Sequence, residues 1–233
     1  MGSQFNKARL TLIATIVVVA LALILIGKVQ IERALHRAAL TEAINTVRSV
    51  KFALDGFATD FDGQYPNDET GERVLEGGLG DEYSNDYFRQ LFITGETQSE
   101  TIFWIKGSPV AGKRAPDDKV SKEGKPQADM ILQAGDCHWA YVVNQSTTRG
   151  TSRPLILDPF LPGTDHFDPE HWNGKAIMLL IDGTIKVSRL NDHHRIVDGS
   201  NEDIFSRSAV AWEGDRGESE ELLVQPDLAS DKR

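Results

Sequence analysis

The feature that most constrains this chain is an apolar run close to its first residue. Residues 10–26 read LTLIATIVVVALALILI and contain no charged side chain. As a helix, the run would extend for about 26 Å at roughly 1.5 Å per residue, which approaches the thickness of a bilayer core. It ends in Gly27-Lys28 rather than in the small-x-small motif of a cleavable secretory signal. We therefore expect a transmembrane helix over residues 10–27, preceded by a cytoplasmic tail over residues 1–9.

The same helix is expected to continue as an amphipathic segment over residues 28–57. Neither Gly nor Pro occurs between Lys28 and Asp55. Apolar residues recur there at steps of three and four, which is the spacing of one helix face: Leu40, Ile44, Val47, Val50, Leu54 and Phe57. Gly56 and the turn-forming sequence DFDG at residues 60–63 are typical of a helix end.

The sequence from residue 58 to residue 212 predicts a small antiparallel β-sheet. Short apolar or β-branched runs are strand candidates at residues 101–106, 138–143, 154–157, 176–181 and 184–188. Asp182-Gly183 favours a tight hairpin between the last two runs. Residues 107–129 are polar and are expected to form a mobile loop, and the acidic residues 213–233 a disordered tail. The expected fold is therefore α+β, with a long N-terminal helix, half transmembrane and half amphipathic, packed on this sheet.

Charge and cysteine content exclude several classes of partner and site. The chain has 25 Lys and Arg against 35 Asp and Glu, a formal net charge of -10. A negative chain is repelled by a phosphate backbone, so we expect no nucleic-acid partner. Cys137 is the single cysteine, which excludes an internal disulfide and a thiolate-only zinc site.

The residues at the expected end of the helix carry a family resemblance. The sequence Asp62-Gly63-Gln64-Tyr65-Pro66 follows an amphipathic helix and, further upstream, a Thr-Leu-Ile run. In this it resembles the type IV pilin and type II secretion pseudopilin family, whose helix ends in a similar stretch. The resemblance covers the chain to about residue 71. It implies a pilin-like domain in which Asp62, Gly63, Tyr65 and Pro66 form the junction between helix and sheet.

The resemblance also implies a function and a location. The chain would be a structural or assembly subunit of a pseudopilus or type IV pilus-like secretion machine, and not an enzyme. It would be a single-pass protein of the bacterial inner membrane, with its C-terminal domain in the periplasm. Its partners would be the lipid bilayer and other pilin-like or secretion-system subunits, including further copies of itself. Lateral packing of the apolar helix would use one set of residues: Leu12, Ile13, Ile16, Val17 and Leu21.

Three positions depart from the pattern of this family. Arg9 stands where prepilins carry the cleavage-site glycine, Leu10 stands where the mature chain begins with Phe, and Ala14 replaces a glutamate. The sequence therefore leaves open whether the chain is cleaved and assembled in the ordinary way.

No cofactor is expected, apart from one candidate calcium site. The segment DPFLPGTDHFDPEH, which begins at Asp158, is rich in the carboxylates that Ca²⁺ prefers. The candidate ligands are Asp158, Asp165, Asp168 and Glu170, and the alternative is a solvated acidic loop. Gly107 to Lys113 fits the spacing of a phosphate-binding loop, but Arg114 replaces the required Ser or Thr.

Two alternatives to a filament subunit remain at this level. One is a membrane-anchored periplasmic binding module that is neither processed nor assembled. The other is a membrane-tethered hydrolase that uses a metal ion held by the acidic loop.

Overall fold

The structure is a computed structural model that describes residues 2–199, 201–206 and 222–230, with side chains from residue 23 onward. It is an α+β chain of three α-helices, short 3₁₀ helices and an antiparallel sheet. The helices are α1 (Gly2–Asp60), α2 (Asp68–Val74), α3 (Ser84–Ile93), η1 (Glu100–Phe103) and η2 (Ala128–Met130). The strands are β1 (Ser121–Lys122), β2 (Lys125–Pro126), β3 (Ala140–Val142), β4 (Pro154–Leu157), β5 (Lys175–Leu180), β6 (Ile185–Arg189) and β7 (Leu223–Val224). The chain forms two compact units, Met1–Glu42 and Ala43–Arg233.

The expected fold with a transmembrane half is wrong. Within the part of the chain that the structure describes, no helix is long and apolar enough to cross a membrane. From residue 23 onward α1 carries a charged residue at nearly every turn, beginning with Lys28, Glu32, Arg33 and Arg37. The same finding corrects the expected single-pass location in the inner membrane. The residues expected to pack the apolar helix, Leu12, Ile13, Ile16, Val17 and Leu21, lie outside the residues whose side chains are described.

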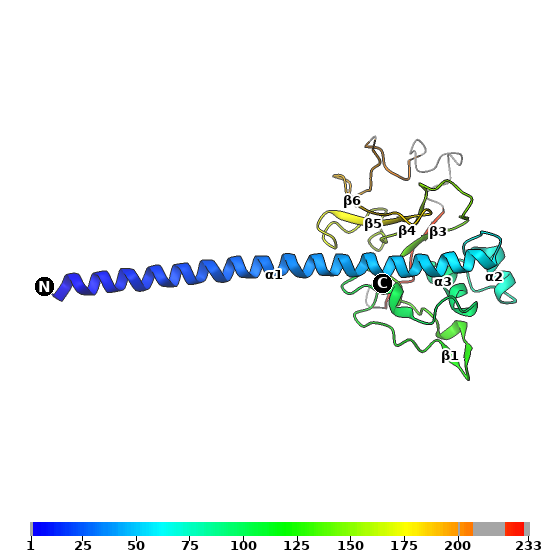
Figure 1. Cartoon of the computed structure of the whole chain (residues 1–233), viewed down its shortest axis with the longest axis horizontal. Coiled ribbons are helices and arrows are strands. Elements are labelled where there is room, and N and C mark those ends of the chain that lie inside the picture. The colour runs from blue at the N-terminus through cyan, green and yellow to red at the C-terminus, as the bar shows by residue number, and fades with distance from the viewer. Residues whose placement is uncertain (1, 200, 207–221, 231–233) are drawn as a thin grey trace. The chain divides into compact units, whose positions relative to one another are not determined.

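The amphipathic part of α1 supplies the first layer of the core. Its buried residues follow the helical spacing read from the sequence: Ala43, Val47, Val50, Leu54 and Phe57. Burial begins at Ala43, and Leu40 and Ile44 remain partly exposed. In Figure 1, strands β3 to β6 lie above this C-terminal part of α1 and the β1–β2 hairpin lies below it.

Five strands form the main sheet in the order β6-β5-β4-β3-β7, and all the pairings are antiparallel. The hairpin between β5 and β6 turns at Asp182-Gly183, as expected, with Gly183 at a φ of 84°. The strand expected over residues 101–106 is wrong, because residues 100–103 form η1 instead. There Phe103 packs its ring against Phe88 and Phe92 of α3.

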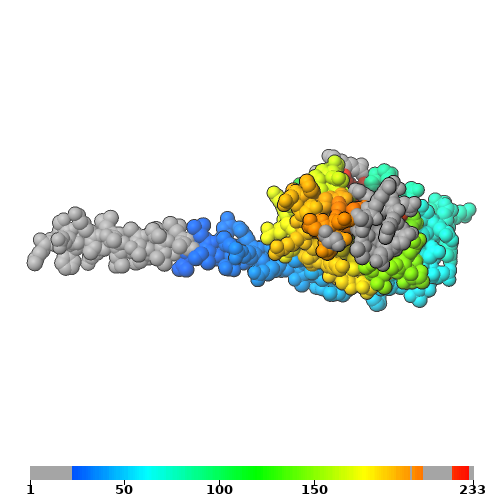
Figure 2. Space-filling view, turned by 90° about the horizontal axis from the view of Figure 1, so that it is seen from above, coloured from blue at the N-terminus to red at the C-terminus, as the bar shows by residue number. Residues whose placement is uncertain are grey.

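The two faces of this sheet are covered by different parts of the chain. Val142, Leu157 and Met178 point to one face, where they join a cluster with Phe160, Phe167, Ile196, Ile204 and Phe205. Figure 2 shows residues 190–199 and 201–206, in yellow-orange to orange, on this side of the domain. On the other face, Tyr141 contacts Tyr87 and Phe88 of α3 with ring centroids 5.8 and 5.1 Å apart. The period-2 alternation of strand side chains therefore gives the domain two apolar layers.

Residues 107–129 and the end of the chain are more structured than expected. The expected mobile loop contains the small β1–β2 hairpin, and its residues Val110 and Ala111 are buried. The expected disordered tail is wrong for residues 222–230. These residues form β7 on the edge of β3. The residues after β7 then accept hydrogen bonds from backbone N–H groups of the domain. The rest of the expected tail lies outside the described residues.

Beyond β7, the C-terminal segment accepts hydrogen bonds from the backbone N–H groups of three buried residues. Ser84 donates to the carbonyl of Gln225, Gly135 donates to the carbonyl of Asp227, and Phe160 donates to the Gln225 side chain, at 3.0, 2.9 and 2.9 Å. A chain that lacks residues 222–233 should therefore lose about 3 kcal/mol or more of unfolding free energy, since each orphaned donor costs roughly 1 kcal/mol. Urea denaturation measures this loss. A chain that ends after Ser230 is the control, and equal stability of the two truncated chains would contradict the structural role of the segment.

Candidate functional site

The sharpest local feature is the junction between α1 and the sheet. Asp62 and Gly63 adopt positive φ values of 55° and 80°, and the Gly63 N–H donates to the carbonyl of Ala58 at 2.8 Å. This left-handed turn ends the helix in the manner that favours glycine. The chain then pairs with the loop after β3. The Tyr65 N–H donates to the Gln145 carbonyl at 3.2 Å, and the Thr147 N–H donates to the Gly63 carbonyl at 2.8 Å.

Tyr65 and Pro66, which follow the turn in the chain, complete the junction. The Tyr65 ring is buried, and its hydroxyl donates to Asp55 Oδ1 at 3.1 Å. Burial first, and then the neighbouring Asp55 carboxylate, raise the pKa of Tyr65 well above its ordinary value. The Tyr141 hydroxyl of β3 donates to the carbonyl of Pro66 at 2.9 Å. The structure thus places all four expected junction residues where the helix meets the sheet.

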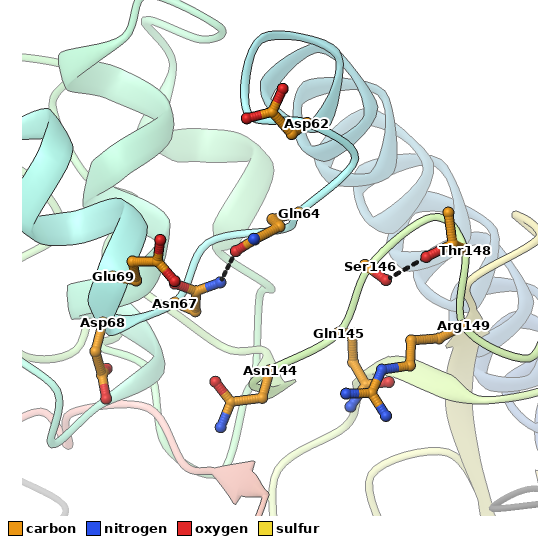
Figure 3. A pocket seen from close by; sticks show the side chains of 10 residues that line it. All are labelled: Asp62, Gln64, Asn67, Asp68, Glu69, Asn144, Gln145, Ser146, Thr148 and Arg149. Atoms are coloured by element: carbon orange, nitrogen blue, oxygen red, sulfur yellow. Dashed lines mark hydrogen bonds between the residues drawn. The ribbon is translucent and has the colours of Figure 1, made fainter. Parts of the chain in front are cut away.

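A polar pocket of about 610 Å³ opens beside this junction. Figure 3 shows side chains from two segments facing it, one at the end of α1 and start of α2, the other after β3. Its lining comprises carboxylates, amides, hydroxyls and one guanidinium: Asp62, Gln64, Asn67, Asp68, Glu69, Asn144, Gln145, Ser146, Thr148 and Arg149. The Asn67 side chain caps α2 by accepting from the Thr70 N–H at 2.9 Å. The pocket can therefore offer polar contacts from a rigid frame.

A second polar group, which sequence reasoning missed, lies inside the core. His138 Nε2 lies 2.8 Å from Asp158 Oδ1, and His138 Nδ1 lies 2.8 Å from Ser108 Oγ. The Asp158 carboxylate also accepts from the Ile177 N–H at 2.5 Å, and Ser108 Oγ accepts from the Val110 N–H at 3.1 Å. Since a carboxylate only accepts, His138 Nε2–H is the donor. The one signal of this group in the sequence is that a histidine and an aspartate each stand next to an apolar strand.

This serine–histidine–aspartate group is built for stability. All three side chains are buried. The adjoining cavity measures about 10 Å³, which leaves no room for a substrate. The hydrogen bonds join the loop at Ser108, the residue His138 before β3, the residue Asp158 after β4, and β5, so the group holds four segments together.

The candidate calcium ligands are not brought together. Asp158 belongs to the buried group, whereas the Asp165 side chain is 81% exposed. Asp168 accepts from the Glu170 N–H at 2.8 Å, which is a local turn. Among the described residues, no three His, Cys, Asp or Glu side chains are placed to hold a metal ion. The geometry therefore gives no support to calcium at this loop.

Cys137 stands beside this group but does not join it. Its side chain is fully buried near Ser84, and burial raises the pKa of the thiol to about 12. Its side chain and that of His138 have separate partners, since Cys137 Sγ lies 3.6 Å from the Trp139 carbonyl and His138 Nε2 contacts Asp158.

Comparison with protein-family models, with curated proteins and with solved structures finds no match to this chain. The candidate functional site therefore rests on geometry. It consists of the junction residues and the polar pocket next to them.

Two glycines allow the junction to be tested with a matched control. A Cβ at Gly63 would lie 2.7 Å from Thr147 Oγ1, whereas a Cβ at Gly77, which has a similar positive φ of 89°, meets nothing within 4 Å. Gly77→Ala should cost about 1 kcal/mol from backbone strain, and Gly63→Ala should cost clearly more, about 2–3 kcal/mol. Thermal or urea unfolding measures both. Adding Thr147→Ala to Gly63→Ala should recover the difference, and equal costs at the two glycines would contradict the close contact.

The buried group is tested by comparing two aspartates of the same segment. Asp158→Ala leaves His138 and the Ile177 N–H without their acceptor, so it should lower the unfolding free energy by about 3–5 kcal/mol. Asp165→Ala removes an exposed carboxylate and should stay within about 0.5 kcal/mol of the unchanged chain. Urea denaturation of both variants checks this, and an Asp158→Ala chain as stable as the control would refute the structural role.

Proposed function

We propose that this chain is a structural subunit of a pilin-like assembly, such as a pseudopilus or a type IV pilus-like secretion machine. The observation that carries the proposal is a run of exposed apolar side chains on α1. Leu23, Ile24, Leu25 and Ile26 are 63%, 66%, 64% and 57% exposed. Large exposed apolar surfaces mark sites of association.

The arrangement of this run favours several neighbours rather than one. Successive residues of a helix point about 100° apart, so four consecutive apolar residues present apolar surface on all sides of α1. Ile31 and Leu35 extend this surface by three turns beyond Leu23 and are 62% and 66% exposed. A helix that is apolar all round is stable only when it is surrounded. Further copies of this chain supply the same helix and can surround one another.

The C-terminal part of α1 supports the same proposal because it packs into the domain. Val47, Val50, Leu54 and Phe57 are fully buried in the domain. One continuous helix of 59 residues therefore carries both the exposed run and the core of the domain. The ordered junction at Gly63 and Tyr65, where the pilin resemblance lies in the sequence, supports the proposal.

The proposal is tested by replacing two residues of the exposed run. Leu25→Gln with Ile26→Gln keeps good helix formers and similar side-chain size, but removes about 1.5–3 kcal/mol of burial per residue in an assembly. The concentration needed for assembly should rise by about a hundredfold or more. Sedimentation velocity of the full chain measures assembly, and electron microscopy shows whether the assemblies are regular.

The control carries two polar changes elsewhere on the same helix. Glu42→Gln with Arg48→Gln alters exposed residues and should leave assembly unchanged. A chain that is monomeric at every concentration, or that forms only amorphous aggregates, would overturn the proposal. So would an equal effect of the control pair.

A further inference from the structure

The polar pocket at the junction carries an excess of negative charge. Asp62, Asp68 and Glu69 supply three carboxylates against the single guanidinium of Arg149, so the formal charge of the lining is −2. Figure 3 shows the three carboxylates on the α1–α2 side of the pocket and Arg149 on the opposite side. Asp68 Oδ1 accepts from the Tyr87 hydroxyl at 2.9 Å, and Asp62 Oδ2 lies 3.9 Å from Arg73 Nη1, too far for a hydrogen bond. The carboxylates thus keep acceptor capacity for a ligand.

Gln145 gives an independent indication of a missing donor. Its side chain lines the pocket and is only 2% exposed. Gln145 Nε2 donates to the carbonyl of Val143 at 3.0 Å, which fixes the orientation of the amide because a carbonyl only accepts. Gln145 Oε1 is then buried without a hydrogen-bond partner in the described structure. An unsatisfied buried acceptor destabilises the free chain, so a donor that reaches this oxygen gains affinity.

We propose that this pocket binds cationic nitrogen groups, either those of a free polyamine or the Lys and Arg side chains of a partner. Ammonium and guanidinium groups carry only donors, which matches a lining of carboxylates and an unpaired amide oxygen. The negative lining disfavours anions. The described residues that line the pocket include no aromatic ring on which a sugar could stack. The binding role is independent of the proposed assembly role, because it concerns the domain and not the exposed apolar run.

The pocket has room for more than one cationic group. A volume of about 610 Å³ lies in the range of small-molecule sites and is far larger than a single ammonium group needs. Gln145 Oε1 is covered from solvent, so a ligand reaches it after a local rearrangement of the pocket lining.

The experiment is calorimetric titration of the full chain with two probes. Spermidine represents a free polyamine, and a blocked Gly-Lys-Lys-Gly peptide represents the side chains of a partner. We expect saturable binding of at least one probe, with a dissociation constant of ~1 mM or tighter. Binding of spermidine alone identifies a small-molecule ligand, and binding of the peptide alone identifies a protein partner. Both outcomes support the pocket as a site for cationic nitrogen.

Matched variants show whether the pocket is responsible. Glu69→Gln and Gln145→Met should each weaken binding by about tenfold, the effect of one lost charge-assisted or buried hydrogen bond. Glu76→Gln makes the same charge change at an exposed position that does not line the pocket, and should leave affinity unchanged. Glu69 is exposed, so its variant stays informative even if Gln145→Met does not fold.

Three results would overturn the proposal. One is the absence of saturable binding for both probes. The second is an equal loss of affinity with Glu76→Gln and Glu69→Gln, which would show diffuse attraction to an acidic chain. The third is equally tight binding of maltose, a neutral ligand, at the same site.

Discussion

The backbone pairing between residues 63–65 and residues 145–147 is the constraint on which the domain depends. It fixes the direction in which the chain leaves α1 and joins that exit to the loop after β3. Because Asn67 follows immediately and caps α2, the position of α2 is set by the same pairing. The aromatic contact of Tyr141 with α3 then closes the layer between helix and sheet. The two-residue turn at Asp62 and Gly63 therefore determines where α2 and the loop after β3 lie at the end of α1.

Features encoded within a few residues could be predicted from the sequence. The buried face of α1, its end near Gly63 and the Asp182-Gly183 hairpin each depend on local spacing or turn chemistry. Features that join distant segments could not be predicted. His138 meets Ser108 and Asp158 across 30 and 20 residues, and the end of the chain meets Asn85 across 142 residues. The local sequence around each of these residues does not show which distant residue it contacts.

The strand prediction over residues 101–106 failed because composition does not show which residues become tertiary neighbours. The run TIFWIK has the β-branched and aromatic residues of a strand, but the rings of α3 hold Phe103 in a 3₁₀ turn. In the acidic loop, composition likewise does not show that the Asp158 carboxylate contacts His138 and the Ile177 N–H. In both segments a tertiary contact decides the local structure.

The buried thiol gives the molecule a property of a different kind. Cys137 is the sole cysteine, it is fully enclosed, and its raised pKa keeps it protonated at neutral pH. Alkylating reagents attack the thiolate, and they need access to it. Alkylation of Cys137 therefore occurs only in molecules whose domain has opened. The rate of this alkylation reports how often the domain opens, and measuring it needs no engineered label.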